Sequence, residues 1–529
     1  MDPDLGEEMQ TRIIVPILSL LLILSAHAIA QTSNATVGGT VSDATGALIP
    51  GVSVTATNVA TGIVTTVLSN EAGAYQFASL QTGTYKVVAE LSGFQTQTYN
   101  NVTLGISQQV RLNFGLQVGS VAQAVEVTAA ADTFIATTSS SIGTVIPDNF
   151  VRDLPLGGRN VMDLVHGVGG VSNMTSVGSD GTTGDTGYFA GGRLSAVNTT
   201  RDGFVVSDGR YNHGAFSITY TSPDLVEEVR VITAPVDAEV GRGSGQVQMV
   251  TRSGTNQLRG SAFWYNRNSA LDASNWFNNF NGVPKDYENR NQFGVRLGGP
   301  IIKNKTFFFF LIDEQRDVLK QTFVAPVLTA QARQGIYRFF LGLDNQNATQ
   351  NNPTVDRKGN PVLNGQPATP QSFSVFNRDQ NRPGFDTSGW IQKVLARMPQ
   401  PNDYTIGDGL NTAGFRWTRR INGLDNFDGS TFDQTNRDQV NIRIDHNFNT
   451  NHKASVIYTW ERGLNHTTQA GVAFWPDGYT GVNNKWPKVL NGSLVSTISS
   501  TLVNELRIGY KTSKQISLAP WYVGKDLLD

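Results

Sequence analysis

Polar and apolar residues alternate with a period of two in several segments of the second half of the chain. Residues 440–445 read Val-Asn-Ile-Arg-Ile-Asp, and the same alternation occurs in residues 292–297, 454–460 and 505–510. Alternation of this kind predicts β-strands with one apolar and one polar face. Such strands fit either a soluble, half-buried sheet or a membrane barrel whose apolar face meets lipid.

The connections between these segments distinguish the two alternatives. We expect seven strands, near residues 258–267, 290–299, 305–316, 437–447, 453–462, 488–498 and 502–511. Their connections are short at 300–304, 448–452 and 499–501, and long at 268–289, 317–436 and 463–487. Outer-membrane barrels combine brief periplasmic turns with extended extracellular loops, so this alternation favours a barrel. Residues 256–529 are therefore predicted to hold the first strands of an antiparallel β-barrel, with 317–436 as a long extracellular loop.

Aromatic residues are expected to form an interfacial girdle near the outer rim of this barrel. They are Trp264, Tyr265, Tyr458, Trp460, Trp486 and Tyr510. A backbone in lipid must pair all its polar groups, which only helices and closed barrels achieve. Outer-membrane transporters use about 22 strands, and at about 10 residues per strand residues 256–529 are too few for closure. We therefore expect an N-terminal fragment or a truncated gene product, with an incomplete barrel.

Two other regions show strands of different kinds. Residues 35–118 hold short alternating stretches separated by turns, such as residues 43–46, and this pattern predicts a small β-sandwich. Residues 142–255 predict a helix around 160–165 and half-buried strands at 229–232 and 246–250. The Gly-rich residues 241–245 lack the Lys and Ser/Thr of a phosphate-binding loop and predict a tight turn.

The beginning of the chain predicts export. An apolar run at residues 13–25 follows Arg12 and precedes Ala28-x-Ala30, the small-residue pattern of signal-peptide cleavage, with Gln31 as the first mature residue. The run is shorter than the about 20 residues that a membrane-spanning helix needs. Because residues 1–8 are acidic, we expect translation to start at Met9. The alternative is a buried core helix.

Composition narrows the function classes. Charged residues make up 16% of the 529 residues, and 41 basic residues nearly balance 43 acidic ones without any Lys/Arg run. A nucleic-acid partner is therefore not expected. The chain has no cysteine, which excludes disulfides, cysteine-based zinc sites and a cysteine nucleophile.

No pattern of catalytic residues stands out. Zinc-binding His-Glu-x-x-His and nucleophile-elbow Gly-x-Ser-x-Gly motifs are absent. His446 and His452 flank a short turn, and the acidic residues between 425 and 433 could offer oxygen ligands to calcium, although their spacing is not that of an EF-hand. Solvated loop residues account for both groups more simply. We expect no catalytic residues, no cofactor and no metal site, and therefore not an enzyme.

Several segments resemble known families. GTVSDATGALIPGVSVTATN and GAYQFASLQTGTYKVVAELSGF resemble the carboxypeptidase regulatory-like domain, a transthyretin-type sandwich with a carbohydrate-binding-like fold. AEVGRGSGQVQMVTRSGTN resembles the plug domain of Oar-like TonB-dependent receptors, and NQFGVRLGGPIIKNKTFFFFLIDEQR resembles the opening of their barrel. The expected fold is all-β dominated: a transthyretin-like β-sandwich, an α+β plug and the first strands of an antiparallel barrel. The expected domains are a signal peptide at 1–30, the regulatory-like sandwich at 31–118, a linker at 119–141, the plug at 142–255 and the partial barrel at 256–529.

The linker contains VEVTA, which resembles the TonB box of these receptors. An exposed run of β-branched residues suits addition to the sheet edge of a partner. The resemblance implies that the energiser TonB contacts Val125, Glu126, Val127, Thr128 and Ala129. The alternative is that this run is the last strand of the preceding sandwich.

The resemblance implies a receptor in the outer membrane that captures an extracellular ligand and imports it with energy passed on by TonB. Expected partners are the periplasmic domain of TonB, outer-membrane lipid and an unidentified ligand such as an oligosaccharide, a peptide or a siderophore, captured by loop 317–436. A surface-binding or adhesion protein without energised transport is the alternative. A secreted carboxypeptidase is disfavoured, because the regulatory-like domain is an accessory of those enzymes. The sandwich itself is either a spacer or a sugar binder.

Overall fold

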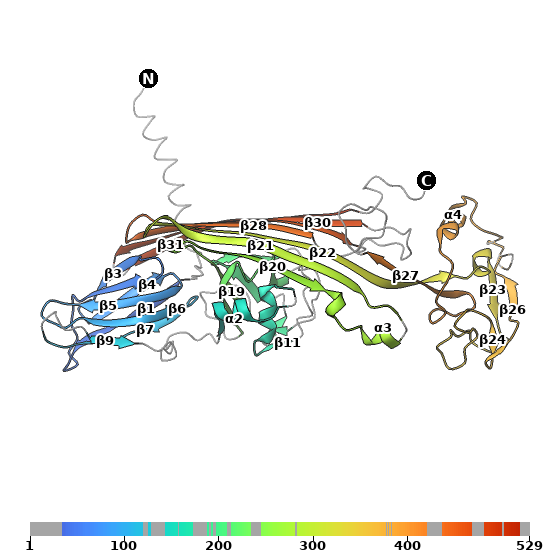
Figure 1. The fold of residues 1–529 in the computed structure, drawn as a ribbon, viewed down its shortest axis with the longest axis horizontal. Coiled ribbons are helices and arrows are strands. Elements are labelled where there is room, and N and C mark those ends of the chain that lie inside the picture. Colours follow the sequence, from blue (N-terminus) through green and yellow to red (C-terminus); the bar gives the residue numbers. More distant parts are fainter. Residues whose placement is uncertain are drawn as a thin grey trace, which may run out of the picture.

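The computed structural model describes residues 34–119, 125–128, 143–156, 158–172, 188–189, 192–193, 197–208, 213–233, 245–280, 283–376, 378, 380–381, 383–420, 436–467, 481–499 and 502–518. These residues form four units in mainly β structure (Figure 1). The signal peptide predicted at 1–30 and the acidic residues at 425–433 lie outside this part of the chain. None of the helices in the described part is both long and apolar enough to cross a membrane.

The first unit, the sandwich, consists of two facing sheets. One has the order β4-β1-β7 with β8 also on β1, and the other has the order β3-β2-β5-β6-β9. The strands are β1 (Ala35–Asp43), β2 (Ser53–Asn58), β3 (Val64–Leu68), β4 (Ala74–Leu80), β5 (Gly83–Glu90), β6 (Gln97–Leu104), β7 (Gln109–Arg111), β8 (Phe114–Leu116) and β9 (Val125–Thr128). Alternate apolar residues such as Val54, Ala56 and Val87 are fully buried between the sheets. The predicted sandwich is confirmed, and Gly46 takes a positive φ of 87° in the predicted turn.

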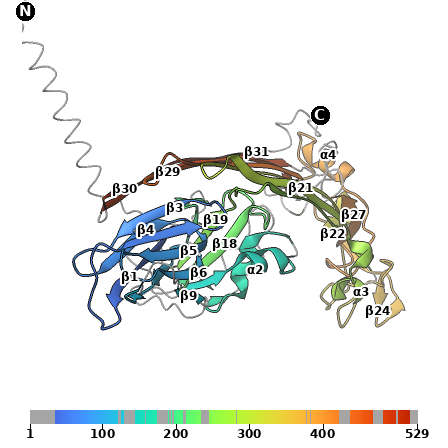
Figure 2. The same cartoon turned by 60° about the vertical axis from the view of Figure 1, so that its left-hand side comes forward.

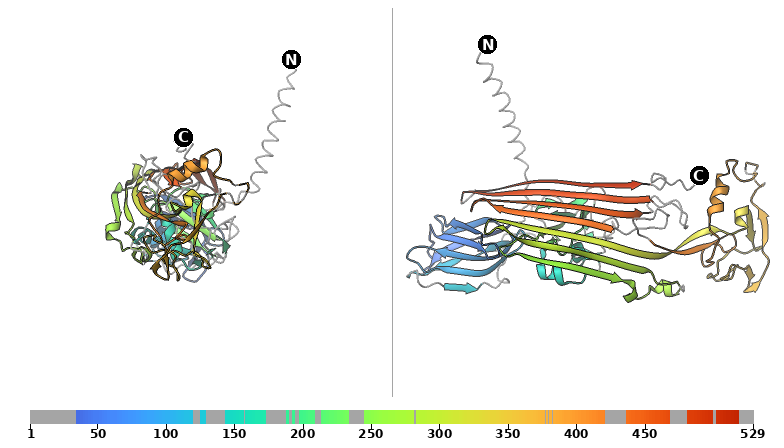
Figure 3. Two further views of the ribbon diagram at one scale, coloured as in Figure 1. Left: turned by 90° about the vertical axis from the view of Figure 1, so that its right-hand side faces the viewer. Right: turned by 45° about the horizontal axis from the view of Figure 1, so that its top comes forward.

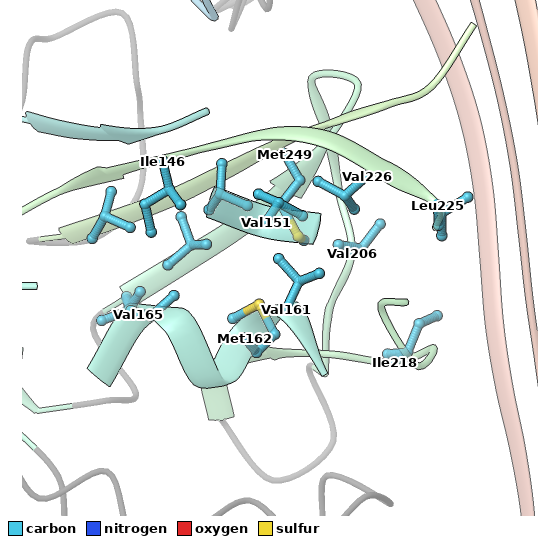
Figure 4. Close-up of a cluster of buried hydrophobic side chains, with 14 of the residues drawn as sticks. Ile146, Val151, Val161, Met162, Val165, Val206, Ile218, Leu225, Val226 and Met249 are labelled. Atoms are coloured by element: carbon cyan, nitrogen blue, oxygen red, sulfur yellow. The ribbon is translucent and has the colours of Figure 1, made fainter. Parts of the chain in front are cut away.

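The second unit, the plug, is built around the sheet β10-β18-β19-β14-β15. Its strands are β10 (Gly143–Ile146), β14 (Val197–Arg201), β15 (Phe204–Val205), β18 (Val226–Ile232) and β19 (Gly245–Thr251). Smaller elements surround the sheet: α2 (Asp148–Asp153), η2 (Val161–Gly167), β11 (Val171–Ser172), β12 (Tyr188–Phe189), β13 (Gly192–Arg193), β16 (Ser207–Asp208) and β17 (His213–Ser217). Val151 of α2 and Val161 and Val165 of η2 pack with the sheet residues in one apolar core (Figure 4). The helix expected near residue 160 is the 3-10 helix η2, which Asn160 caps by accepting from the N–H of Met162.

The third unit, the wall, is a single antiparallel sheet with the order β20-β21-β22-β28-β29-β30-β31. Its strands are β20 (Arg259–Asn268), β21 (Tyr287–Ile302), β22 (Thr306–Leu328), β28 (Asn436–Asn447), β29 (His452–Thr467), β30 (Gly481–Ser499) and β31 (Leu502–Leu518). These confirm all seven strands predicted in this region. The sheet arches over the plug and the sandwich, and β20 and β31 are its two ends within the described residues (Figure 2). The wall is a partial barrel.

Side-chain burial in the wall is the reverse of that in a soluble protein. Ile442 and Ile444 of β28 are 38% and 43% exposed on the convex face. The alternate residues Arg443 and Asp445 point to the opposite face and are buried. Apolar residues outside and polar residues inside are the arrangement of a membrane barrel. Tyr265 is a correction to the predicted aromatic girdle, because it faces inward and its ring lies 3.7 Å from the guanidinium of Arg159 in the plug.

The short and long connections of the wall lie at opposite ends. The tight turns after β21, β28 and β30 lie at the end that holds the sandwich, and the long excursions lie at the other end (Figures 1 and 3). One excursion contains η5 (Ser269–Leu271) and α3 (Trp276–Phe280). This separation is the one that the sequence pattern predicted.

The longest excursion forms a fourth unit, the loop domain (residues 329–411). β22 continues to Leu328 and pairs there with β27 (Thr412–Arg420), so this excursion begins later than the predicted residue 317. The domain contains η6 (Ala332–Gln334), β23 (Ile336–Phe339) paired with β26 (Gln371–Ser374), β24 (Val362–Leu363) paired with β25 (Gln366–Pro367), and α4 (Trp390–Arg397). Phe340, Val355 and Leu410 form a small core of its own. The loop is therefore a folded unit rather than an irregular segment.

Candidate functional site: the contact between plug and wall

Arg201, at the end of β14, carries a buried charge from the plug into the wall. Its side chain is 1% exposed, and its Nη2 donates to Oγ1 of Thr459 on β29 at 2.9 Å. Thr459 in turn donates to Asn441 on β28 at 2.7 Å. Burial lowers the pKa of Arg201, while the nearby carboxylates of Asp202 and Glu461 raise it. The arginine is thus tied to the wall by its hydrogen bond to Thr459 and by the charge of Glu461, while Asp202 adds a negative charge from the plug itself.

The backbone of Tyr220 is held between two wall side chains. Oε2 of Glu461 accepts from the N–H of Tyr220 at 2.7 Å, and Nε2 of Gln439 donates to the carbonyl of Tyr220 at 2.7 Å. Gln439 also donates to Glu461 at 2.8 Å. Because β28 and β29 place these residues opposite each other in register, one pair of neighbouring strands presents both an acceptor and a donor to the backbone of the same residue.

The ring of Tyr220 is covered by a paired arginine. The guanidinium carbon of Arg437 on β28 lies 3.3 Å from the ring centroid, and Arg437 donates to Asp313 on β22 at 2.8 Å, with both side chains almost fully buried. The phenol of Tyr220 lies 2.8 Å from the carbonyl of Gly158 and 2.6 Å from that of Arg159, and it donates to them. Burial raises the pKa of Tyr220 well above its ordinary value, so the phenol stays protonated.

A second group of contacts lies nearer the sandwich. Nη1 of Arg443 on β28 donates to the carbonyl of Thr251 at 2.6 Å and to Oδ1 of Asp202 at 3.2 Å. Asp202 also accepts from the N–H of Thr251 at 2.9 Å. Its carboxylate therefore joins the turn after β14, the end of β19 and the wall.

The turn between β14 and β15 is seated against the last strand of the wall. Gly203 takes a positive φ of 72°, and a Cβ atom there would lie 1.8 Å from Nη1 of Arg507 on β31. Phe204 occupies the space left by Gly509, since a Cβ on Gly509 would lie 2.0 Å from its ring. Lys511 of β31 donates to the carbonyl of Ser207 at 2.8 Å. Glycine suits position 203 because of its positive φ, and it suits position 509 because the ring of Phe204 leaves no room for a Cβ atom.

At the other side of the plug, Arg159 contacts the first wall strand. It pairs with Asp224 at 2.6 Å, and its guanidinium lies 4.7 Å from the ring of Phe263 on β20. Nε2 of Gln292 on β21 donates to the carbonyl of Gly158 at 3.2 Å. The plug is therefore held by β20 and β21 as well as by β28 to β31.

This interface is polar, although apolar residues also meet there. When the plug separates from the wall, hydrogen bonds between them are replaced by hydrogen bonds to water, with a modest net change in free energy. Separating a large apolar interface costs more, because its whole area becomes exposed to water. Phe309 and Leu311 of β22 and Val489 of β30 lie in the same buried cluster as the plug core, so release of the plug breaks polar contacts at a modest net cost and also exposes this apolar patch. Sequence reasoning did not single out Arg201, Tyr220 or Glu461. The available signal was the row of inward polar residues on β28 and β29.

The predicted energiser contact lies outside this interface. Val125–Thr128 form β9, which pairs in parallel with β6 at the edge of the sandwich, from Gln97 opposite Val125 to Asn100 opposite Thr128. Ala129 lies outside the described residues. The other edge of β9 has no neighbouring strand among the described residues. The segment is thus both a strand of the sandwich and an edge to which a further strand can be added.

The two histidines that flank the short turn between β28 and β29 have separate partners. His446 lies 2.8 Å from the hydroxyl of Thr306, and His452 lies 2.9 Å from that of Ser496. Within the described ranges, no cluster of three or more His, Asp or Glu side chains is arranged to hold a metal ion.

An open sheet with apolar residues outside, and a separate domain seated on its polar face, define the class of outer-membrane receptors whose barrel is filled by a plug. Comparisons with known families agree. The outer membrane beta barrel domain matches residues 250–522, more than half of the chain. The TonB-dependent receptor plug domain matches residues 136–246, and the carboxypeptidase regulatory-like domain matches residues 36–117.

The chain therefore belongs to the outer membrane beta barrel family, and its three domains make it an Oar-like TonB-dependent receptor. It is 28% identical to the TonB-dependent transporter Oar of Myxococcus xanthus over 296 residues, which are 54% of this chain and 27% of that protein. The matched part thus spans about a quarter of the length of this relative.

Solved structures with similarity include two receptors. The ferric-catecholate import receptor Fiu from E. coli K12 is 12% identical, with a TM-score of 0.30 over 71% of this chain and 49% of that one. A mutant of the ferric enterobactin receptor PfeA from Pseudomonas aeruginosa is 12% identical, with a TM-score of 0.33 over 70% of this chain and 49% of that one.

Proposed function

We propose that this chain is part of an outer-membrane transporter that captures an extracellular ligand and imports it with energy passed on by TonB. The observation that carries the proposal is the polar seat of the plug, in which Glu461 and Gln439 hold the backbone of Tyr220. These contacts keep the plug in the barrel at rest. When the plug moves, the polar groups of both plug and wall can be solvated by water. Import then requires a force that moves the plug, and a ligand that triggers it.

Under this proposal the energiser contacts Val125, Glu126, Val127, Thr128 and Ala129. The open edge of β9 supports this assignment, because an added strand gains main-chain hydrogen bonds without any rearrangement of the sandwich. The position of the sandwich also supports it. The sandwich lies at the end of the wall with short turns, which is the periplasmic end in outer-membrane barrels (Figure 1).

The loop domain is our candidate for ligand capture. It lies at the opposite end of the wall, and its own core keeps it folded beyond the membrane (Figure 3). The nature of the ligand does not follow from the fold, which serves many cargoes. The further partners in this proposal are outer-membrane lipid along the convex face and the periplasmic domain of TonB, and it includes no catalytic step and no cofactor.

We also propose the division of the chain given by its sequence pattern. A cleaved signal peptide at 1–30 directs export, and the sandwich at 31–118, the linker at 119–141, the plug at 142–255 and the partial barrel at 256–529 follow. Outer-membrane localisation follows from the barrel family itself.

One observation favours a second candidate, a surface-binding or adhesion protein without energised transport. Because β9 is already paired with β6, the VEVT segment can be a structural strand with no energiser contact. Capture of the complete receptor by the periplasmic domain of TonB distinguishes the candidates. The transporter predicts capture that is lost when residues 125–129 are deleted, together with loss of uptake and unchanged surface binding. Capture and uptake that survive this deletion would refute the assigned contact.

A further inference from the structure

The sandwich has no assigned role, but the structure shows it bound to the plug at a specific place. The N–H of Ile106, in the loop after β6, donates to Oε1 of Glu228 on plug strand β18 at 2.7 Å. Nη1 of Arg230 donates to the carbonyls of Ile106 at 3.1 Å and Ser107 at 3.0 Å. Two side chains of one plug strand thus bind both polar groups of the same residue of the sandwich.

The loop is shaped for this contact. Ser107 adopts a positive φ of 50°, which is unfavourable for a residue with a side chain. A Cβ atom on Gly105 would lie 2.8 Å from Oε1 of Glu228, so glycine lets the carboxylate approach the loop in this position. Ile106 is 1% exposed and is covered from both sides. These features are those of a specific docking contact.

The wall contributes a second set of contacts with the sandwich. Asn256, just before β20, donates through Nδ2 to the carbonyl of Thr61 at 2.7 Å, and Lys453 of β29 donates to the hydroxyl of Thr65 at 2.8 Å. A small polar cavity remains where the three units meet, and Gln81, Asp202 and Glu505 are among its lining residues. Like the seat of the plug, the docking surface is polar and can be separated.

The plug strand that binds the sandwich, β18, is the direct neighbour of β10, the strand at which the linker enters the plug. β10, the first plug strand after the linker, pairs with β18 along its length, and Val145 lies opposite Arg230. β9, before the linker, is paired with β6 of the sandwich. A pull on β9 therefore acts first on the sandwich, and the sandwich is bound to β18.

We propose that the sandwich is a latch on the plug: Glu228 and Arg230 hold loop 105–108, and a pull on β9 must lift the sandwich off β18 before it can move the plug. This inference rests on the proposed energiser contact. It assigns the regulatory-like domain a mechanical role in place of sugar binding or simple spacing.

Force spectroscopy on the complete receptor in lipid nanodiscs, which leave its periplasmic face open to the probe, tests the latch without knowledge of the ligand. The periplasmic domain of TonB is attached to the probe, engages β9 and is retracted. The wild type should show an early rupture, for release of the sandwich, before the longer extension of the plug. A disulfide in the double variant Gly105→Cys/Glu228→Cys should abolish the early rupture, and reduction should restore it at a lower force, because Glu228 is then absent.

The matched control is a disulfide inside the sandwich, in Thr55→Cys/Thr66→Cys. These threonines are directly opposite in β2 and β3, with their hydroxyls 3.1 Å apart. This staple should leave the early rupture unchanged. Extension of the plug with no earlier event in the wild type, or an early event that the 105–228 disulfide does not affect, would overturn the latch but leave the energiser contact standing. Failure of TonB to engage the wild type at all would overturn the energiser contact and, with it, the latch.

A second measurement tests the docking contact without TonB. The native chain has no cysteine, so Ser107→Cys reports on this loop alone when it is labelled with a maleimide. Adding Arg230→Ala should speed the labelling by about tenfold, as expected for loss of hydrogen bonds to a charged group. Labelling of the exposed variant Glu71→Cys should not change. An unchanged rate at Ser107→Cys would show that Arg230 does not hold the loop.

Discussion

Glu461 is the wall residue on which the seat of the plug depends most directly. It is 1% exposed and accepts from both the N–H of Tyr220 and the amide of Gln439. In Glu461→Ala both donors are left buried without this acceptor, which should destabilise the seated plug by about 1–3 kcal/mol. The measurement is the urea concentration at which trypsin begins to cut the plug in membrane-embedded receptor.

The control for this prediction is Glu314→Ala on β22. Glu314 pairs with Arg316, and both side chains are partly exposed, so its removal should change stability by less than about 1 kcal/mol. Equal urea sensitivity of the two variants would mean that the plug is not held through Glu461.

Glu228 makes the docking of the sandwich dependent on pH. Burial raises the pKa of Glu228 from 4.5 to about 7, although the N–H of Ile106 lowers it. The other charged groups that face it are Glu227, which raises its pKa, and Arg230, which lowers it, and loop 105–108 brings no charge. A raised pKa in the docked state means that docking takes up a proton, so docking weakens as pH rises through the window from about 4.5 to about 7.

We therefore expect labelling of Ser107→Cys to become faster between pH 6 and 8, relative to Glu71→Cys at the same pH. The neutral variant Glu228→Gln should remove most of this dependence, because no proton is then exchanged on docking. A pH profile that Glu228→Gln leaves intact would locate the titrating group elsewhere.

At the scale of elements, the turn between β14 and β15 depends on one glycine. Gly203→Ala places a Cβ atom on a residue with a positive φ of 72°, which strains the turn, and this atom displaces the guanidinium of Arg507 that lies 1.8 Å away. The expected loss is about 1–3 kcal/mol in the stability of the seated plug, measured by the same trypsin assay. Gly115→Ala is the control, because a Cβ there meets nothing within 4 Å, and it should leave cleavage of the plug unchanged.

The elements of the wall could be predicted from the sequence because lipid on one side and a polar lumen on the other impose a period of two. The same rule did not predict β27, because its nine residues follow a long stretch without periodicity. β27 pairs with residues 320–328 of β22, which lie beyond the end of the predicted strand. The seat of the plug could not be predicted either. Tyr220 and Glu461 are 241 residues apart in sequence, and their contact depends on how the plug is oriented inside the wall. The docking of loop 105–108 on β18 depends on tertiary structure in the same way.

At the scale of the whole molecule, the sandwich and the loop domain have apolar cores of their own, whereas the core of the plug also includes Phe309, Leu311 and Val489 of the wall. Units of this kind can change their contacts without unfolding. The arrangement places β9, the proposed input of force, at one end of the molecule and the loop domain, the proposed site of ligand capture, at the other (Figure 3).

This independence makes a strong prediction for the loop domain. Leu328 and Thr412 are paired at the tips of β22 and β27, so residues 329–411 leave and return at the same point. Replacing them with an Asn-Gly turn should close an ordinary hairpin and leave the wall and the seat of the plug intact. We expect an unchanged urea concentration for cleavage of the plug, together with loss of binding to whichever extracellular ligand the complete receptor takes up. If the shortened receptor still binds and imports that ligand, capture must take place on other loops, and the folded excursion would need a different role.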